Sequence, residues 1–129
     1  MKFKLFLIAA LALFGSMTFA SSETQSPKKV LRHIVLFKFK DKATAAQIKE
    51  VEAAFRKLPT QIKEIKGFEW GTNNSPEGLD QGLTHAFFLT FDSEADRAVY
   101  LPHPAHKAFG KILGPYLDKA VVVDYWAEK

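Results

Sequence analysis

Four histidines are the residues of this chain best suited to acid–base chemistry. They are His33, His85, His103 and His106. A neutral histidine accepts a proton near pH 7, and a carboxylate on its other ring nitrogen fixes the tautomer and strengthens the base. Each of the four is therefore a candidate catalytic or binding residue.

Each histidine also has a purely structural interpretation. His33 interrupts an apolar strand face, where a lone imidazole is usually a satisfied core residue. His85 lies among apolar neighbours in the same way, and we interpret it as structural. His106 can be a buried helix residue bonded to a backbone carbonyl. We keep both interpretations open for His33 and His106.

A metal site is not predicted. His103 and His106 are three residues apart, a spacing that can place two nitrogens on one helix face. However, Pro104 lies between them and no acidic third ligand is close in the sequence. We expect His103 to cap the start of a helix, and we expect neither a metal nor a cofactor.

The composition excludes several other classes of site. The chain has no cysteine, so disulfides and thiolate catalysis are excluded. Its glycines are too scattered for a phosphate-binding loop, and no serine lies in a nucleophile elbow. The net charge is +4 for all 129 residues. Without Lys2 and Lys4 the chain has 16 basic and 14 acidic residues. This small basic excess argues against a nucleic-acid partner.

The first twenty residues are predicted to be an export signal. A short basic segment precedes the apolar stretch 5–14, and small residues at Thr18 and Ala20 occupy the positions that signal peptidase reads. We expect cleavage after Ala20, a polar linker over residues 21–29, and a periplasmic or secreted protein without stable membrane association. Retention of the segment as a membrane anchor is the alternative.

The remaining chain, residues 30–127, is predicted to be one domain of four strands and two helices. The apolar and β-branched runs 30–39, 67–72, 83–91 and 120–126 predict strands. Thr44 opens the first helix with a capping box to Gln47, and Pro59 is expected to end or kink it. Ser93 caps the second helix, which prolines at 102 and 104 interrupt before it resumes over 105–113.

This order, β-α-β-β-α-β, predicts a ferredoxin-like α+β fold with a four-stranded antiparallel sheet. Two helices cover one face of such a sheet, yet its strands are apolar on both faces. In the third strand Phe87 and Leu89 point one way and Phe88 the other, and in the fourth Val122 opposes Val123. The economical second cover is another copy of the chain, so we expect sheet-to-sheet pairing into a homodimeric α/β barrel. The alternative is a monomer that uses the open face for ligands or lipid.

Five segments of the sequence resemble one known family. They are LRHIVLFKFKD, GFEWGTN, THAFFLTF, HPAHKAFG and VVVDYW. They look like the stress-responsive dimeric α/β-barrel (Dabb) family, whose fold is the dimer described above. HPAH is the most specific of these segments.

The resemblance also implies site residues. A family enzyme closes a polyketide chain by aldol condensation without cofactor or metal, and its general base is matched by His106. Tyr100 matches a residue that binds or polarises the substrate, His33 one that lines the pocket, and Asp124 a residue that supports the base. We expect an apolar pocket between the sheet and the second helix that takes a small apolar or aromatic molecule, with His106 hydrogen-bonded to Asp124. The alternatives are a non-enzymatic stress-response dimer whose histidines serve packing, and an oxidase of aromatic substrates, for which the sequence gives no specific support.

Overall fold

The computed structural model describes residues 28–128, so the expected export signal and most of the expected linker lie outside the described residues. The elements follow the predicted order, with the second helix in two parts. The strands are β1 (Leu31–Phe39), β2 (Gly67–Thr72), β3 (His85–Phe91) and β4 (Leu117–Trp126), and the helices are α1 (Ala45–Gln61), α2 (Glu94–Tyr100) and α3 (Pro104–Leu113).

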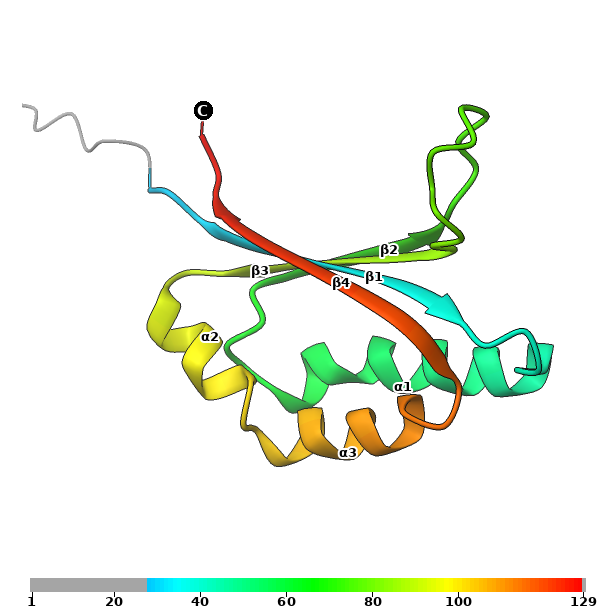
Figure 1. Ribbon diagram of the computed structural model, residues 1–129. Helices are drawn as coiled ribbons and strands as arrows, with labels where there is room; N and C mark the ends of the chain where they lie inside the picture. The colour runs from blue at the N-terminus through cyan, green and yellow to red at the C-terminus, as the bar shows by residue number, and fades with distance from the viewer. Residues whose placement is uncertain (1–27, 129) are drawn as a thin grey trace, which may run out of the picture.

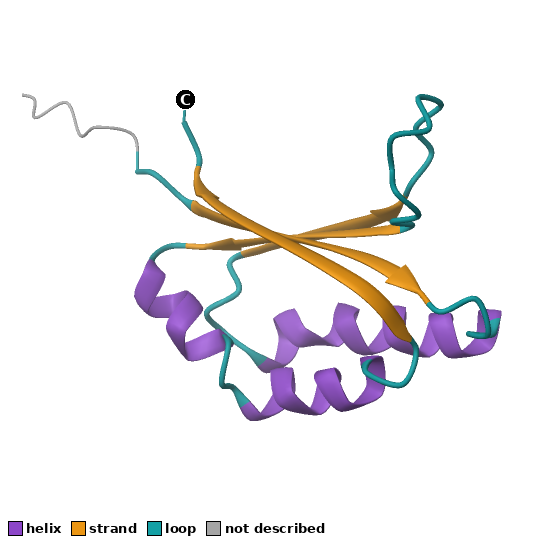
Figure 2. Cartoon of the chain, in the orientation of Figure 1, coloured by secondary structure: helices purple, strands orange, loops and turns teal. Residues whose placement is uncertain are grey.

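The sheet has the strand order β2-β3-β1-β4, and every neighbouring pair is antiparallel. All three helices lie on one face of it, and the β2–β3 loop rises on the other side (Figures 1 and 2). This arrangement confirms the ferredoxin-like α+β fold. Within residues 28–128, no helix has both the length and the apolar character needed to cross a bilayer.

Helix α1 begins with the predicted capping box. The Thr44 hydroxyl accepts from the Gln47 backbone N–H, and the Gln47 side chain accepts from the Thr44 N–H, so two helix-end donors are satisfied. Pro59 lies inside the helix, which continues to Gln61 instead of ending at the proline. The last turn is held by buried Leu58 and Ile62, whose carbonyl and N–H form a 2.9 Å hydrogen bond.

Aromatic rings fill the space between α1, α3 and the sheet. Phe55 of α1 stacks on Phe87 of β3, with ring centroids 4.1 Å apart and planes within 3° of parallel. Phe109 of α3 meets Phe55 edge-on at 4.7 Å, and Phe37 of β1 lies 5.4 Å from Phe87. The helix layer is thus anchored to the sheet by closely packed rings.

The second helix is interrupted between Tyr100 and Pro104, as the prolines at 102 and 104 led us to expect. Ser93 caps α2 by accepting from the Asp96 N–H. After the break at residues 101–103, the His103 ring nitrogen accepts from the Ala105 N–H at 3.1 Å and caps α3. The prediction that His103 caps a helix is confirmed.

Strand register shows that the sheet is apolar on both faces. Ile34 of β1 lies opposite Phe88 of β3 and Val123 of β4, and these three side chains share the face away from the helices because directly paired residues point the same way. Val122, by contrast, lies opposite buried Val35 and points to the helix side. Phe88 therefore lies on the uncovered face, where a second copy would contact it, and Val122 does not.

We expect Phe88→Glu to convert the dimer to a monomer, because it places a carboxylate in the middle of the uncovered apolar face. Val122→Glu is the matched control: it adds the same charge on the helix side, where the side chain is already 54% exposed. Light scattering at micromolar concentration, with circular dichroism to verify folding, measures the result. A wild-type monomer, or a folded Phe88→Glu dimer, would contradict the face-to-face assembly.

Candidate functional site

Asp124 lies at the centre of a polar cluster on the helix side of the sheet. It is directly opposite His33 in the β1–β4 register, so both side chains point to the same face. Its Oδ1 lies 2.7 Å from Nδ1 of His33, which is buried. Because a carboxylate only accepts, the hydrogen of this bond is on Nδ1.

The second oxygen of Asp124 is occupied by Arg97 of α2. The Arg97 guanidinium donates to Asp124 Oδ2 at 2.7 Å and also lies 3.7 Å from Glu94. The Arg97–Asp124 ion pair thus connects α2 to the edge strand β4. Sequence reasoning missed Arg97; the signal available was its position one helical turn before Tyr100, on the same helix face.

Tyr100 lies between the two histidines of the cluster. Its ring centroid is 5.6 Å from that of His33 and 4.3 Å from that of His106. Burial, and then the nearby Asp124 carboxylate, raise the pKa of the Tyr100 hydroxyl above its ordinary value of 10.0. The hydroxyl forms no hydrogen bond with the described part of the chain, whereas every described side-chain polar atom sealed from solvent has a partner. Tyr100 as a whole is only 1% exposed, so the hydroxyl has at most a narrow opening to solvent.

His106 of α3 is bonded to the backbone. Its Nδ1 lies 2.8 Å from the carbonyl oxygen of Leu101, which can only accept, so Nδ1 carries the hydrogen. In the neutral ring this leaves Nε2 as a proton acceptor.

The predicted hydrogen bond between His106 and Asp124 is wrong. Both Asp124 oxygens are occupied by His33 and Arg97, and His106 uses its Nδ1 for the Leu101 carbonyl exposed by the helix break. Tyr100 and His106 approach each other across that break, with ring centroids 4.3 Å apart. The prolines allow it because they let α3 start in a new direction.

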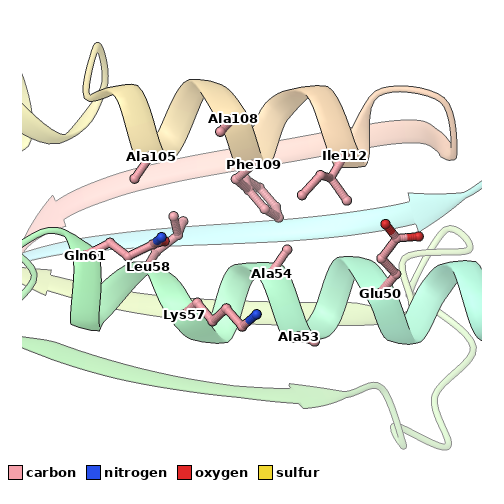
Figure 3. A pocket seen from close by; sticks show the side chains of 10 residues that line it. All are labelled: Glu50, Ala53, Ala54, Lys57, Leu58, Gln61, Ala105, Ala108, Phe109 and Ile112. Atoms are coloured by element: carbon pink, nitrogen blue, oxygen red, sulfur yellow. The ribbon is translucent and has the colours of Figure 1, made fainter.

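The cavities lie elsewhere. A groove of about 380 Å³ runs between α1 and α3 (Figure 3), with Glu50 and Lys57 on its α1 side and Ala105 and Ala108 on its α3 side. Three others lie against the outer sheet face and the helix ends. None of these four is lined by the polar cluster, so the expected pocket beside His106 is not among them.

An uncovered apolar surface does adjoin the cluster. Val122 and Trp126 flank Asp124 on the helix side of β4 and are 54% and 38% exposed. The helix layer therefore leaves this part of β4 open. Among residues 28–128, no three His, Asp or Glu side chains are grouped as a metal site requires.

Comparisons with known proteins agree with this architecture. The family model of the stress responsive A/B barrel domain matches residues 31–127. The stress-response A/B barrel domain-containing protein HS1 of Arabidopsis thaliana is 39% identical over 101 residues, covering 78% of this chain and 93% of that protein. Olivetolic acid cyclase of Cannabis sativa is 31% identical over 99 residues, covering 77% and 98%.

Solved structures support the same conclusion. The hydroxynitrile lyase of Passiflora edulis superimposes with a TM-score of 0.75 at 32% identity, covering 80% of this chain and 97% of that one. A dimeric ferredoxin-like protein of Thermobifida fusca superimposes with a TM-score of 0.66 at 32% identity, covering 78% and 93%. Such dimeric neighbours support a homodimer for this protein. By its family match, its curated relatives and its fold, the chain belongs to the stress-responsive A/B barrel domain family.

Proposed function

We propose that this protein is an exported, cofactor-independent acid–base catalyst that makes or breaks a carbon–carbon bond beside a carbonyl group. The observation that carries the proposal is the pairing of Tyr100 with His106. One supplies a hydrogen-bond donor and the other a proton acceptor, and their rings lie 4.3 Å apart. Two similar proteins, a cyclase and a lyase by name, support this reaction class.

The two residues have complementary roles. His106 Nε2 removes a proton from the substrate, because Nδ1 is held by the Leu101 carbonyl. The Tyr100 hydroxyl stays protonated, since burial raises its pKa, and it donates to the substrate oxygen on which negative charge develops. For a cyanohydrin, His106 takes the hydroxyl proton, the carbon–carbon bond breaks, cyanide leaves with the electron pair and receives the proton, and an aldehyde remains.

Asp124 and His33 act as positioning residues in this proposal. Asp124 joins His33 of β1 to Arg97 of α2, and the His33 ring packs edge-on against Tyr100 at 5.6 Å. Together they fix the ring that donates to the substrate. His33 also borders the site, as the family resemblance implies for a residue that lines the pocket.

The substrate would be a small apolar or aromatic molecule lying on the uncovered helix side of β4. Val122 and Trp126 supply exposed apolar surface there, on either side of Asp124. Deeper entry is limited, because the stacked rings of Phe55 and Phe87 occupy the interior. A compact substrate fits this site better than one with a long chain.

The same filled interior favours a second candidate, a non-enzymatic stress-response dimer. His106 is satisfied by a backbone carbonyl and His33 by a carboxylate, as packing residues would be. Proton-transfer activity that depends on His106 separates the two candidates.

Export predicts a mature protein that begins at Ser21. Signal peptidase recognises small residues at Thr18 and Ala20. Intact-mass measurement of the protein recovered outside the cytoplasm should show loss of residues 1–20. Recovery of the full chain in the membrane fraction would support the anchor instead.

His106→Gln should abolish catalysis, because glutamine keeps a polar side chain but has no basic nitrogen near pH 7. We expect release of benzaldehyde from mandelonitrile, a simple aromatic cyanohydrin, to fall by about 100-fold or more. His103→Asn is the control, since asparagine can still cap α3. Wild-type release no faster than in buffer, or equal rates in wild type and His106→Gln, would overturn the acid–base proposal.

Tyr100→Phe should reduce the loss of stability at alkaline pH. Above pH 10.0 the unfolded chain releases the Tyr100 proton, whereas the folded chain keeps it, because the folded pKa is raised. Ionisation of Tyr100 therefore has no effect on the free energy of unfolding below pH 10. Above pH 10 the free energy of unfolding falls as the pH rises. Urea titrations give the free energy of unfolding at pH 8 and at pH 11. The drop between these two pH values should be smaller for Tyr100→Phe than for wild type, and an equal drop would contradict the raised pKa.

A further inference from the structure

A second chain of hydrogen-bonded side chains lies apart from the Tyr100–His106 site, at the start of β3. His85 Nε2 is 2.8 Å from Glu52 Oε1, and its Nδ1 is 2.8 Å from the Thr84 hydroxyl. Because the carboxylate only accepts, Nε2 of the neutral ring carries the hydrogen. Nδ1 can then accept from the Thr84 hydroxyl, whose oxygen also lies 3.5 Å from the Phe37 carbonyl oxygen.

The middle residue, His85, is the most buried of the three, whereas Glu52 is partly exposed and Thr84 is exposed. His85 is buried, with Trp70 parallel to its ring at 6.3 Å and Phe39 edge-on at 5.0 Å. Glu52 reaches it from α1, and the Thr84 side chain is exposed. A hydroxyl bonded to a histidine that a carboxylate orients is the arrangement that activates serine and threonine nucleophiles.

Thr84 is one of the residues that line a groove of about 510 Å³ at the base of the β2–β3 loop, which rises from the sheet in Figure 1. Leu36, Leu79 and Val121 supply its apolar lining. Asn73 also lines it; its side-chain oxygen accepts from the Ser75 N–H, which leaves its amide nitrogen as a donor. An apolar groove with a nucleophile, a base and an amide donor matches the requirements of acyl transfer.

We propose that Thr84, His85 and Glu52 form a second, hydrolytic site for esters of small apolar acids. The Thr84 oxygen attacks the ester carbonyl carbon while its proton passes to His85 Nδ1. The bond to the alcohol oxygen then breaks, and the leaving alcohol takes that proton. Water attacks the acyl-threonine, loses its proton to His85, and releases the acid as Thr84 recovers its hydrogen.

The groove lies next to the expected dimer contact. Leu36 and Val121 belong to the face of the sheet away from the helices, which we expect the second copy to cover. The protein is therefore assayed as the intact dimer.

The test uses p-nitrophenyl butyrate as the probe and measures nitrophenolate release. We expect Thr84→Ala and Glu52→Gln each to lower the rate by roughly tenfold or more, and Thr84→Ser to retain most of it. Thr60→Ala is the matched control, since Thr60 is an exposed helix residue whose hydroxyl donates to the Lys57 carbonyl. Its rate should equal that of wild type.

A covalent readout separates the proposal from unspecific acylation of lysines. Acid-quenched wild-type protein, digested and analysed by mass spectrometry, should carry a butyryl group on Thr84. Absence of wild-type hydrolysis, or equal rates in wild type and Thr84→Ala with no acyl group on Thr84, would overturn the proposal. It would do so whatever the outcome at His106, which lies on another element and is left unchanged.

Discussion

A four-stranded sheet that is apolar on both faces cannot be covered by a single layer of helices. The aromatic contacts of Phe55, Phe87 and Phe109 attach that layer to one face. The other face, with Ile34 and Phe88, is left for a second copy, and the similar protein of Thermobifida fusca is a dimer. The alternation of strand side chains also determines which face carries the polar site. Phe88 points away from the helices, whereas His33 and Asp124 point toward them.

The elements were predictable because local signals determine them. Apolar and β-branched runs predicted all four strands, and Thr44, Ser93 and His103 marked where helices begin. At Pro59 the signal allowed either an end or a kink, and the helix runs on to Gln61. Capping residues and apolar runs act over a few residues, and they predicted structure correctly over that range.

The connections within the site were not predictable from the same signals. His33 and Asp124 are 91 residues apart, and only the β1–β4 register puts them side by side. Sequence periodicity gives the face on which a residue lies but not the partner across the strand. The same gap explains why Arg97 was missed and why Asp124 was assigned to His106. His85 was read as structural because Glu52, its partner on α1, is equally remote in the sequence.

The pairing of β1 with β4 has a consequence for synthesis and folding. The sheet acquires its outer strand, and His33 its carboxylate, only when residues near the end of the chain have been made. Contacts between such distant segments form slowly, because the chain loses the entropy of closing a long loop before the stabilising contacts form. Until β4 has been made, the sheet lacks its outer strand and the growing chain remains accessible to any machinery that handles unfolded polypeptides.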